Sequence, residues 1–181
     1  MNNLLLSEIW IYPVKSLGGI SMKTAEVKRK GLRYDRRWML IDSHGVAMTQ
    51  RVYHEMALFK LSLDDGNINI AYTKDGRILH SASFIPENAM TGSKSKARVW
   101  DDEVEVVINT RLSEWFSELL HTTCRFVAFP ENNPRKVDPQ YNVNEAHVSL
   151  ADAYPFLIIG QRSLDDLNQK LEHSVPMNRF R

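Results

Sequence analysis

A short segment near the N-terminus places a cation, a hydroxyl group and two glycines in a row, at Lys15-Ser16-Leu17-Gly18-Gly19. The glycines allow a tight turn that exposes backbone N–H groups. With the charge of Lys15 and the hydroxyl of Ser16, such a turn would form a nest for an oxyanion. Two glycines after a strand are also typical of an ordinary turn, so the anion site gains weight if Arg36 or Arg37 lies alongside.

The two arginines belong to a basic run at residues 28–37, which holds six bases and one acid. A cluster of this kind attracts phosphate, a pterin pyrophosphate or nucleic acid, and it is also typical of a solvated surface strip. Nucleic-acid binding needs aromatic side chains among the bases, and Tyr34 and Trp38 are present. Trp38 nevertheless begins the apolar run 38–41, which is typical of a core strand. The net charge of +1 also argues against nucleic acid.

Metal-binding and nucleophilic motifs are missing from the sequence. The six histidines show neither HxxxH nor HExxH spacing, and there is no CxxC pair, so a zinc site would need residues from distant segments. The sequence contains no GxSxG, no GxxxxGK[ST] and no GxGxxG. Cys124 is the single cysteine and is expected to fill space in the core. We therefore expect neither a catalytic residue nor a metal ligand in these 181 residues.

Composition places the chain among ordinary globular proteins. It has 43% apolar and 25% charged residues, which argues against disorder, collagen and coiled coil. No apolar run approaches the ~20 residues of a membrane span. The first ten residues lack a basic region and a cleavage site, so no signal peptide is expected. One cysteine excludes an internal disulfide and favours a reducing cytoplasm.

Alternating apolar residues and turn signals predict a β-rich first part of the chain, in which Asp-Gly pairs at 65–66 and 75–76 mark hairpin turns. The expected strands lie at 4–12, 23–28, 37–41, 46–50, 58–63, 68–72, 78–82, 97–100, 104–108 and 125–129. Apolar residues at helical spacing predict a helix over 110–120, with Thr110 or Ser113 as its cap.

The last fifty residues carry weaker signals. Residues 130–150 are polar, contain prolines and are expected to form a long loop. The continuous apolar run 155–159 predicts a strand buried on both faces. A second helix is expected from Ser163, its N-cap, with Leu164, Leu167 and Leu171 as the buried stripe. Residues 174–181 resemble a loop that leads into another strand, which suggests a fragment.

Four segments in order resemble one family: IYPVKS at 11–16, GLRYDRRW at 31–38, DAYPFLII at 152–159, and SLDDLN at 163–168 with NRFR at 178–181. The sequence resembles the MOSC family with its N-terminal β-barrel-like region, which includes amidoxime-reducing components and bacterial reductases of N-hydroxylated compounds. The resemblance implies a mixed α+β, β-rich fold. It implies a MOSC N-terminal region at 1–129, a linker at 130–150 and the incomplete start of a MOSC β-barrel at 151–181.

The resemblance also implies a site. Lys15 and Ser16 would bind the phosphate end of a molybdenum cofactor, a molybdopterin, and Arg36 and Arg181 would contact the cofactor as well. Ala153 and Tyr154 depart from relatives that carry small hydroxyl residues there, so no role passes to them. The family's molybdenum-ligating cysteine lies beyond Phe-Arg, so Cys124 is not that ligand.

The chain is therefore expected to be the N-terminal part of a cytoplasmic reductase and to be inactive, without bound cofactor, as a fragment. The full protein would reduce an N-hydroxylated small molecule with electrons from a ferredoxin-like or cytochrome domain or protein, without a membrane and without nucleic acid. The alternatives are a non-catalytic β-rich module that binds a phosphorylated ligand or a partner protein, and a nucleic-acid binder that uses residues 28–37.

Overall fold

The computed structural model describes residues 4–180, and its largest sheet has four antiparallel strands in the order β5-β11-β10-β9. These strands are β5 (Trp38–Asp42), β9 (Ser93–Val99), β10 (Asp102–Asn109) and β11 (Cys124–Ala128). A three-stranded antiparallel sheet contains β6 (Phe59–Asp64), β7 (Asn67–Lys74) and β8 (Arg77–Phe84). The Asp-Gly turns predicted from the sequence join these three strands, with Asp65 and Asp75 at positive φ.

Two short strand pairs complete the β structure: β1 (Ile9–Ile11) with β2 (Ile20–Met22), and β3 (Val27–Lys28) with β4 (Gly31–Leu32). The helices are α1 (Thr110–Leu119) and α2 (Gln161–Asn168). Single 3-10 turns are η1 (His54–Leu58), η2 (Asn88–Met90), η3 (Pro139–Tyr141) and η4 (Met177–Arg179). The fold is mixed α+β and β-rich, as predicted, and strand pairing among the described residues leaves its sheets open.

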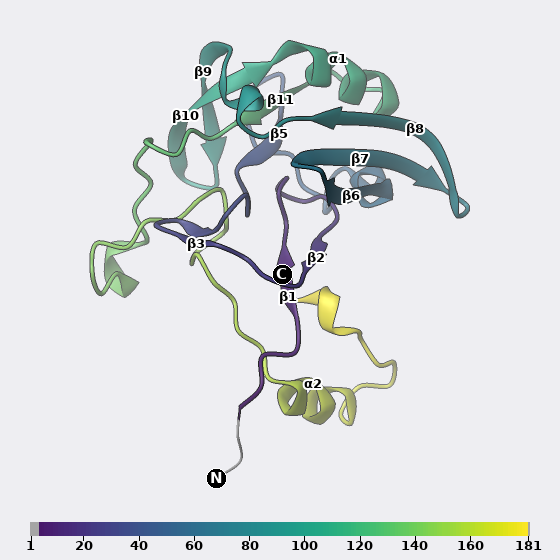
Figure 1. Ribbon diagram of the computed structural model, residues 1–181, viewed down its shortest axis with the longest axis vertical. Helices are drawn as coiled ribbons and strands as arrows, with labels where there is room; N and C mark the ends of the chain where they lie inside the picture. Colours follow the sequence, from purple (N-terminus) through teal and green to yellow (C-terminus); the bar gives the residue numbers. More distant parts are fainter. Residues whose placement is uncertain (1–3, 181) are drawn as a thin grey trace.

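The main core lies where α1 covers the two larger sheets (Figure 1). Aromatic side chains fill much of it. Phe116 of α1 stacks on Phe126 of β11 with ring centroids 5.6 Å apart, and it meets Phe59 of β6 at 5.0 Å. Trp38 is fully buried and packs its edge against Phe84 at 5.0 Å. A smaller cluster that includes Phe129 and Leu150 covers part of the other face of the four-stranded sheet.

Several predicted strands are shorter than expected. Residues 46–50 form only single bridges, Ile41 with Ala47 and Val46 with Arg98, and the expected strand at 23–28 shrinks to β3. The cap of α1 is Asn109, whose side chain accepts the Leu112 N–H at 3.0 Å, so neither Thr110 nor Ser113 caps it. An Asn one residue earlier satisfies the same free N–H groups.

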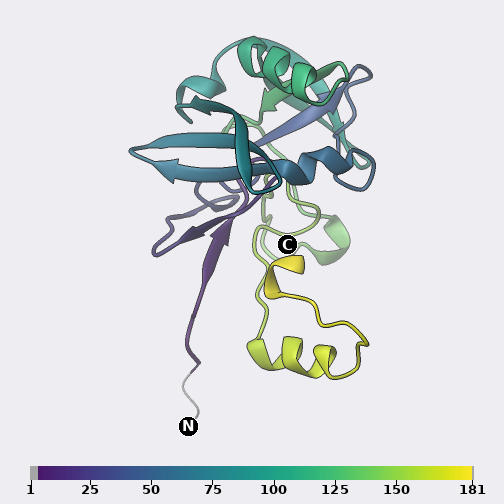
Figure 2. The same cartoon turned by 90° about the vertical axis from the view of Figure 1, so that its right-hand side faces the viewer.

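The C-terminal prediction is wrong in two respects. Residues 155–159 form no strand, and the side chains of Phe156, Leu157 and Ile158 are exposed, because no described segment pairs with them. Gly160 rather than Ser163 is the N-cap of α2, without a side-chain cap bond, and Leu171 is exposed. Both views show α2 and η4 set apart from the two larger sheets (Figures 1 and 2).

Candidate functional site

The turn that carries Lys15 and Ser16 is fixed by its own backbone. The Lys15 N–H donates to Trp38 O at 2.8 Å, Leu17 N–H to Val14 O at 3.1 Å, and Gly18 N–H to Phe59 O at 3.3 Å. Three N–H groups of the turn are therefore occupied within the protein and do not contribute to the expected backbone nest for an anion. The left-handed residue is Ser16 (φ 64°), not a glycine. The side chains of Lys15 and Ser16 also reach the cavity described below.

The Lys15 side chain is almost completely buried and reaches a segment far along the chain. Its Nζ donates to Leu150 O at 2.9 Å and forms an ion pair with Asp152. Burial lowers the pKa of Lys15, against the opposing effect of Asp152. Burial would raise the pKa of Asp152, but hydrogen bonds from Lys15 and Trp100 outweigh it and the pKa is lowered. The Lys15 contact therefore favours the charged form of Asp152, while burial works against the charged form of Lys15.

Arg36 is held by a buried carboxylate beside it. Asp35 accepts the Tyr12 N–H at 2.7 Å through Oδ1 and Arg36 Nη1 at 2.6 Å through Oδ2. The Arg36 backbone is left-handed (φ 49°), and its guanidinium lies 4.7 Å from the centre of the Tyr12 ring. A non-glycine residue in this conformation costs free energy, and such residues concentrate at functional sites. Asp35 thereby ties the end of β1 to Arg36.

These side chains meet at one cavity of about 670 Å³. Lys15, Ser16 and Arg36, three of the four site residues predicted from the sequence, line it. The fourth, Arg181, lies outside the described residues, while Arg179 lines the cavity. The rest of the wall comes from four segments of the chain: Tyr12 and Leu17, residues 49–51, Trp100, and residues 151–157. Ala153 and Tyr154 belong to this last segment.

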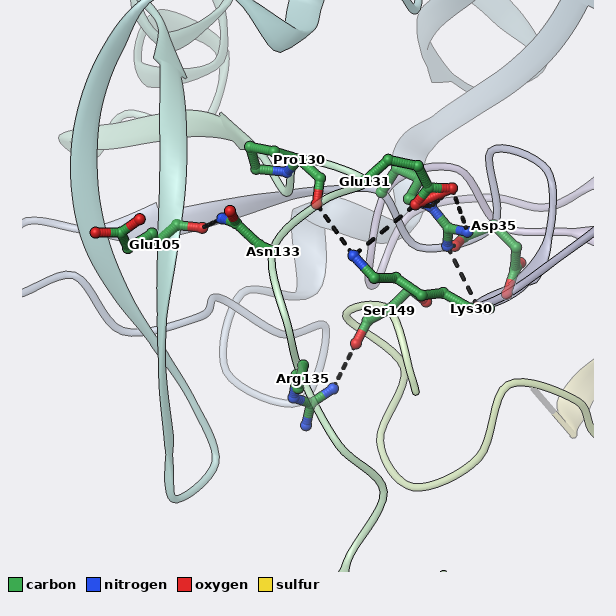
Figure 3. A network of polar contacts seen from close by, with 9 residues as sticks. Lys30, Asp35, Glu105, Pro130, Glu131, Asn133, Arg135 and Ser149 are labelled. Atoms are coloured by element: carbon green, nitrogen blue, oxygen red, sulfur yellow. Dashed lines mark hydrogen bonds and ion pairs between the residues drawn. The ribbon is translucent and has the colours of Figure 1, made fainter. Parts of the chain in front are cut away.

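The remaining bases of the run 28–37 bind within the protein instead of facing the cavity. Arg37 is buried and donates to Glu131 and to the carbonyl of Asp35. Lys30 is buried beside it, with Nζ 3.1 Å from Pro130 O and 3.9 Å from Glu131 (Figure 3). Lys28, Arg29 and Arg33 also have partners in the described part of the chain. Lys28, Arg29 and Arg33 are nevertheless exposed, so half of the run keeps the character of a solvated surface strip.

Sequence reasoning missed Arg51, Trp100 and Asp152. Trp100 stands in the turn between β9 and β10 with a left-handed backbone (φ 55°), and its side chain is half exposed. Its indole N–H donates to Asp152 at 3.0 Å, and the Arg51 guanidinium lies 5.7 Å from its ring centre. A bulky residue in a two-residue hairpin turn, directly before Asp101 and Asp102, is unusual and could have drawn attention to Trp100.

The described residues offer this cavity no metal ligand set and no activated thiol. Residues 4–180 contain no group of three His, Cys, Asp or Glu side chains placed to hold a metal ion. Cys124 is buried in the core beside Ser117, and burial raises its pKa. Within the same residues, no helix has the length and apolar character needed to cross a membrane. The cavity can bind an anion through side chains.

Comparison with known proteins gives a family match and several relatives. The sequence matches the model of the MOSC N-terminal beta barrel domain over residues 3–123. Mitochondrial amidoxime-reducing component 1 of Mus musculus is 32% identical over 97% of this chain and 53% of its own length, and the Homo sapiens protein of the same name is 31% identical over 97% and 54%. Molybdenum cofactor sulfurase of Arabidopsis thaliana is 28% identical over 92% of this chain and 21% of its own length. The chain thus spans about half the length of these amidoxime-reducing components.

Proposed function

We propose, because this chain belongs to the MOSC N-terminal beta barrel domain family, that its cavity holds the phosphate-bearing end of a molybdenum cofactor. The observation that supports the proposal is the meeting of Lys15, Ser16 and Arg36 at one cavity wall. The two cations come from different segments and are each fixed by a carboxylate. Such fixed donors bind phosphate oxygens with charge-assisted hydrogen bonds.

The residues present fit one end of the cofactor. An ammonium, a hydroxyl and a guanidinium around a cavity of about 670 Å³ suit a phosphorylated pterin. A soft thiolate for the metal is not among the described cavity residues. When bound, the cofactor supplies the redox chemistry at its metal. This chain would hold and orient the phosphate end of that group.

Each cation keeps donors free for the ligand. A lysine ammonium has three donors, and Leu150 O and Asp152 take two from Lys15. A guanidinium has five, and Asp35 takes one from Arg36. The fixed pairs prevent the two side chains from collapsing into other positions, which reduces the entropy lost on binding.

The protein that contains this chain would be a cytoplasmic reductase of N-hydroxylated small molecules. Its relatives named for amidoxime reduction support this substrate class. Electrons would come from a ferredoxin-like or cytochrome domain or protein. The chain by itself would lack activity, because the residues it brings to the cavity would hold only the phosphate end of the cofactor.

Molybdenum and pterin contents of the whole natural protein test the proposal. Lys15→Ala and Arg36→Ala are expected to lower both contents while far-UV circular dichroism stays unchanged. Arg77→Ala, an exposed arginine on β8 outside the cavity, is the matched control and is expected to keep full content. Contents equal to those of the natural protein in both cavity variants would refute the proposal. Phosphate binding without any molybdenum would favour the non-catalytic phosphate-binding module.

A further inference from the structure

The two cations selected from the sequence, Lys15 and Arg36, both form ion pairs at the cavity wall. Lys15 is paired with Asp152, and Arg36 with Asp35, so each of these cations brings its own carboxylate. Among the residues that the structure describes, no carboxylate forms a salt bridge with Arg51 or Arg179, the other two basic residues of the wall. Asp152 also acts electrostatically on Arg51, so this one carboxylate faces two cations. The wall therefore keeps an excess of positive charge around Arg51 and Arg179, which sequence reasoning did not select.

Arg51 occupies a defined position next to the Lys15 turn. Its neighbour Gln50 donates from Nε2 to Ser16 O at 2.8 Å. The Val52 and Tyr53 N–H groups both donate to Thr49 O, at 3.1 and 2.9 Å, and close a turn around Arg51. The side chain is exposed, as a residue that meets an incoming ligand must be.

The indole ring of Trp100 lies next to the Arg51 guanidinium. The guanidinium lies 5.7 Å from the ring centre, within the range of a cation–π contact. The indole N–H is bonded to Asp152, which is itself bonded to Lys15. Contacts therefore run without a break from Arg51 through Trp100 and Asp152 to Lys15. The left-handed backbone of Trp100 is energetically unfavourable, and strain of this kind is typical of functional sites.

We propose that Arg51, supported by the ring of Trp100, directly contacts the anionic group of the ligand and supplies most of the electrostatic attraction of this wall. The inference rests on the proposed phosphate site and adds a binding residue to it. Lys15 and Arg36 then act mainly as fixed hydrogen-bond donors. Arg51 is the residue whose charge the ligand neutralises.

Titration of the chain with inorganic pyrophosphate, followed by calorimetry, tests the inference. A lost charge-assisted contact is expected to weaken binding roughly tenfold or more in Arg51→Gln. Arg51→Lys keeps the charge and is expected to recover part of the affinity. Arg77→Gln removes the same charge from an exposed site outside the cavity and is expected to leave binding unchanged.

Tryptophan fluorescence gives a second readout that a purely structural role would not produce. Pyrophosphate is expected to change the emission of the natural chain, and Trp100→Phe is expected to abolish most of that change. Tight binding with equal affinity in Arg51→Gln and the natural chain would refute the role of Arg51 and leave the proposed function intact. No binding by the natural chain, with Lys15→Ala equally inert, would refute both.

Discussion

Lys30 belongs to a polar network with Arg37, Pro130 and Glu131, and its titration tests how strongly that network is desolvated. Its side chain is buried, and its Nζ donates to Pro130 O (Figure 3). The same nitrogen lies 4.4 Å from the centre of the Phe129 ring. Burial lowers the pKa of Lys30 from 10.5 to about 8, because the nearby Glu131 compensates only part of the lost solvation. The folded protein therefore releases this proton at a lower pH than the unfolded chain does.

The direction of the effect on stability follows from proton counts. Between pH 8 and 10.5 the unfolded chain keeps the Lys30 proton while the folded chain has lost it, so the contribution of Lys30 to stability rises with pH in this window. Below pH 8 both states are protonated and the full burial cost applies. From pH 7 to pH 10 the gain is about 2.5 kcal/mol, at 1.36 kcal/mol per pKa unit.

Urea unfolding at pH 7 and pH 10 gives the change in the free energy of unfolding between the two pH values. Comparing this change in the natural chain and in Lys30→Met isolates the contribution of Lys30. From pH 7 to pH 10, the free energy of unfolding of the natural chain is expected to rise by about 2.5 kcal/mol relative to that of the variant. Other titrating groups occur in both proteins and cancel. Lys23→Met, which removes an exposed lysine, is the control and is expected to show no such gain. A gain below about 0.5 kcal/mol would refute the desolvation of Lys30.

Four further substitutions test the core, the site and the N-terminal ends of two helices. Trp38→Ala is expected to cost about 3–5 kcal/mol in urea unfolding, and a loss under about 1 kcal/mol would contradict its buried position. Asp35→Asn is expected to cost about 1.5–3 kcal/mol and to weaken pyrophosphate binding, because Arg36 loses its fixed partner. Asn109→Ala is expected to cost about 1 kcal/mol, whereas Ser163→Ala should change stability by less than about 0.5 kcal/mol; equal effects in thermal unfolding would contradict the observed caps.

Local patterns predict the elements that are stabilised locally. The Asp-Gly turns around Gly66 and Gly76 and the apolar stripe of α1 give the three-stranded sheet and the helix correctly. The strand predicted at 155–159 does not form, because an apolar stretch indicates only a preference for burial. Whether it becomes a strand depends on a pairing segment, and the structure describes none beside it. Strand pairing is a property of two segments, and a single run cannot specify it.

Some cavity residues can be predicted from their residue type, whereas others are recognised only from their side-chain contacts in the structure. Lys15, Ser16 and Arg36 could be selected because a cation-hydroxyl turn and a basic run both favour anions. Asp152 and Trp100 belong to segments with no such signal, and they join the cavity only because their side chains bond to Lys15 and to each other.

The distribution of charge over the cavity explains why a basic run is a poor guide to it. A cation bound to a buried carboxylate is fixed in position, but its field at the ligand is largely cancelled by its partner. The run 28–37 gives the cavity one side chain, Arg36, whose charge is balanced by Asp35. Arg51 stands outside the run, forms no salt bridge among the described residues, and shares the field of Asp152 with Lys15. Ligand attraction should therefore depend more on Arg51 than on the run that dominates the sequence.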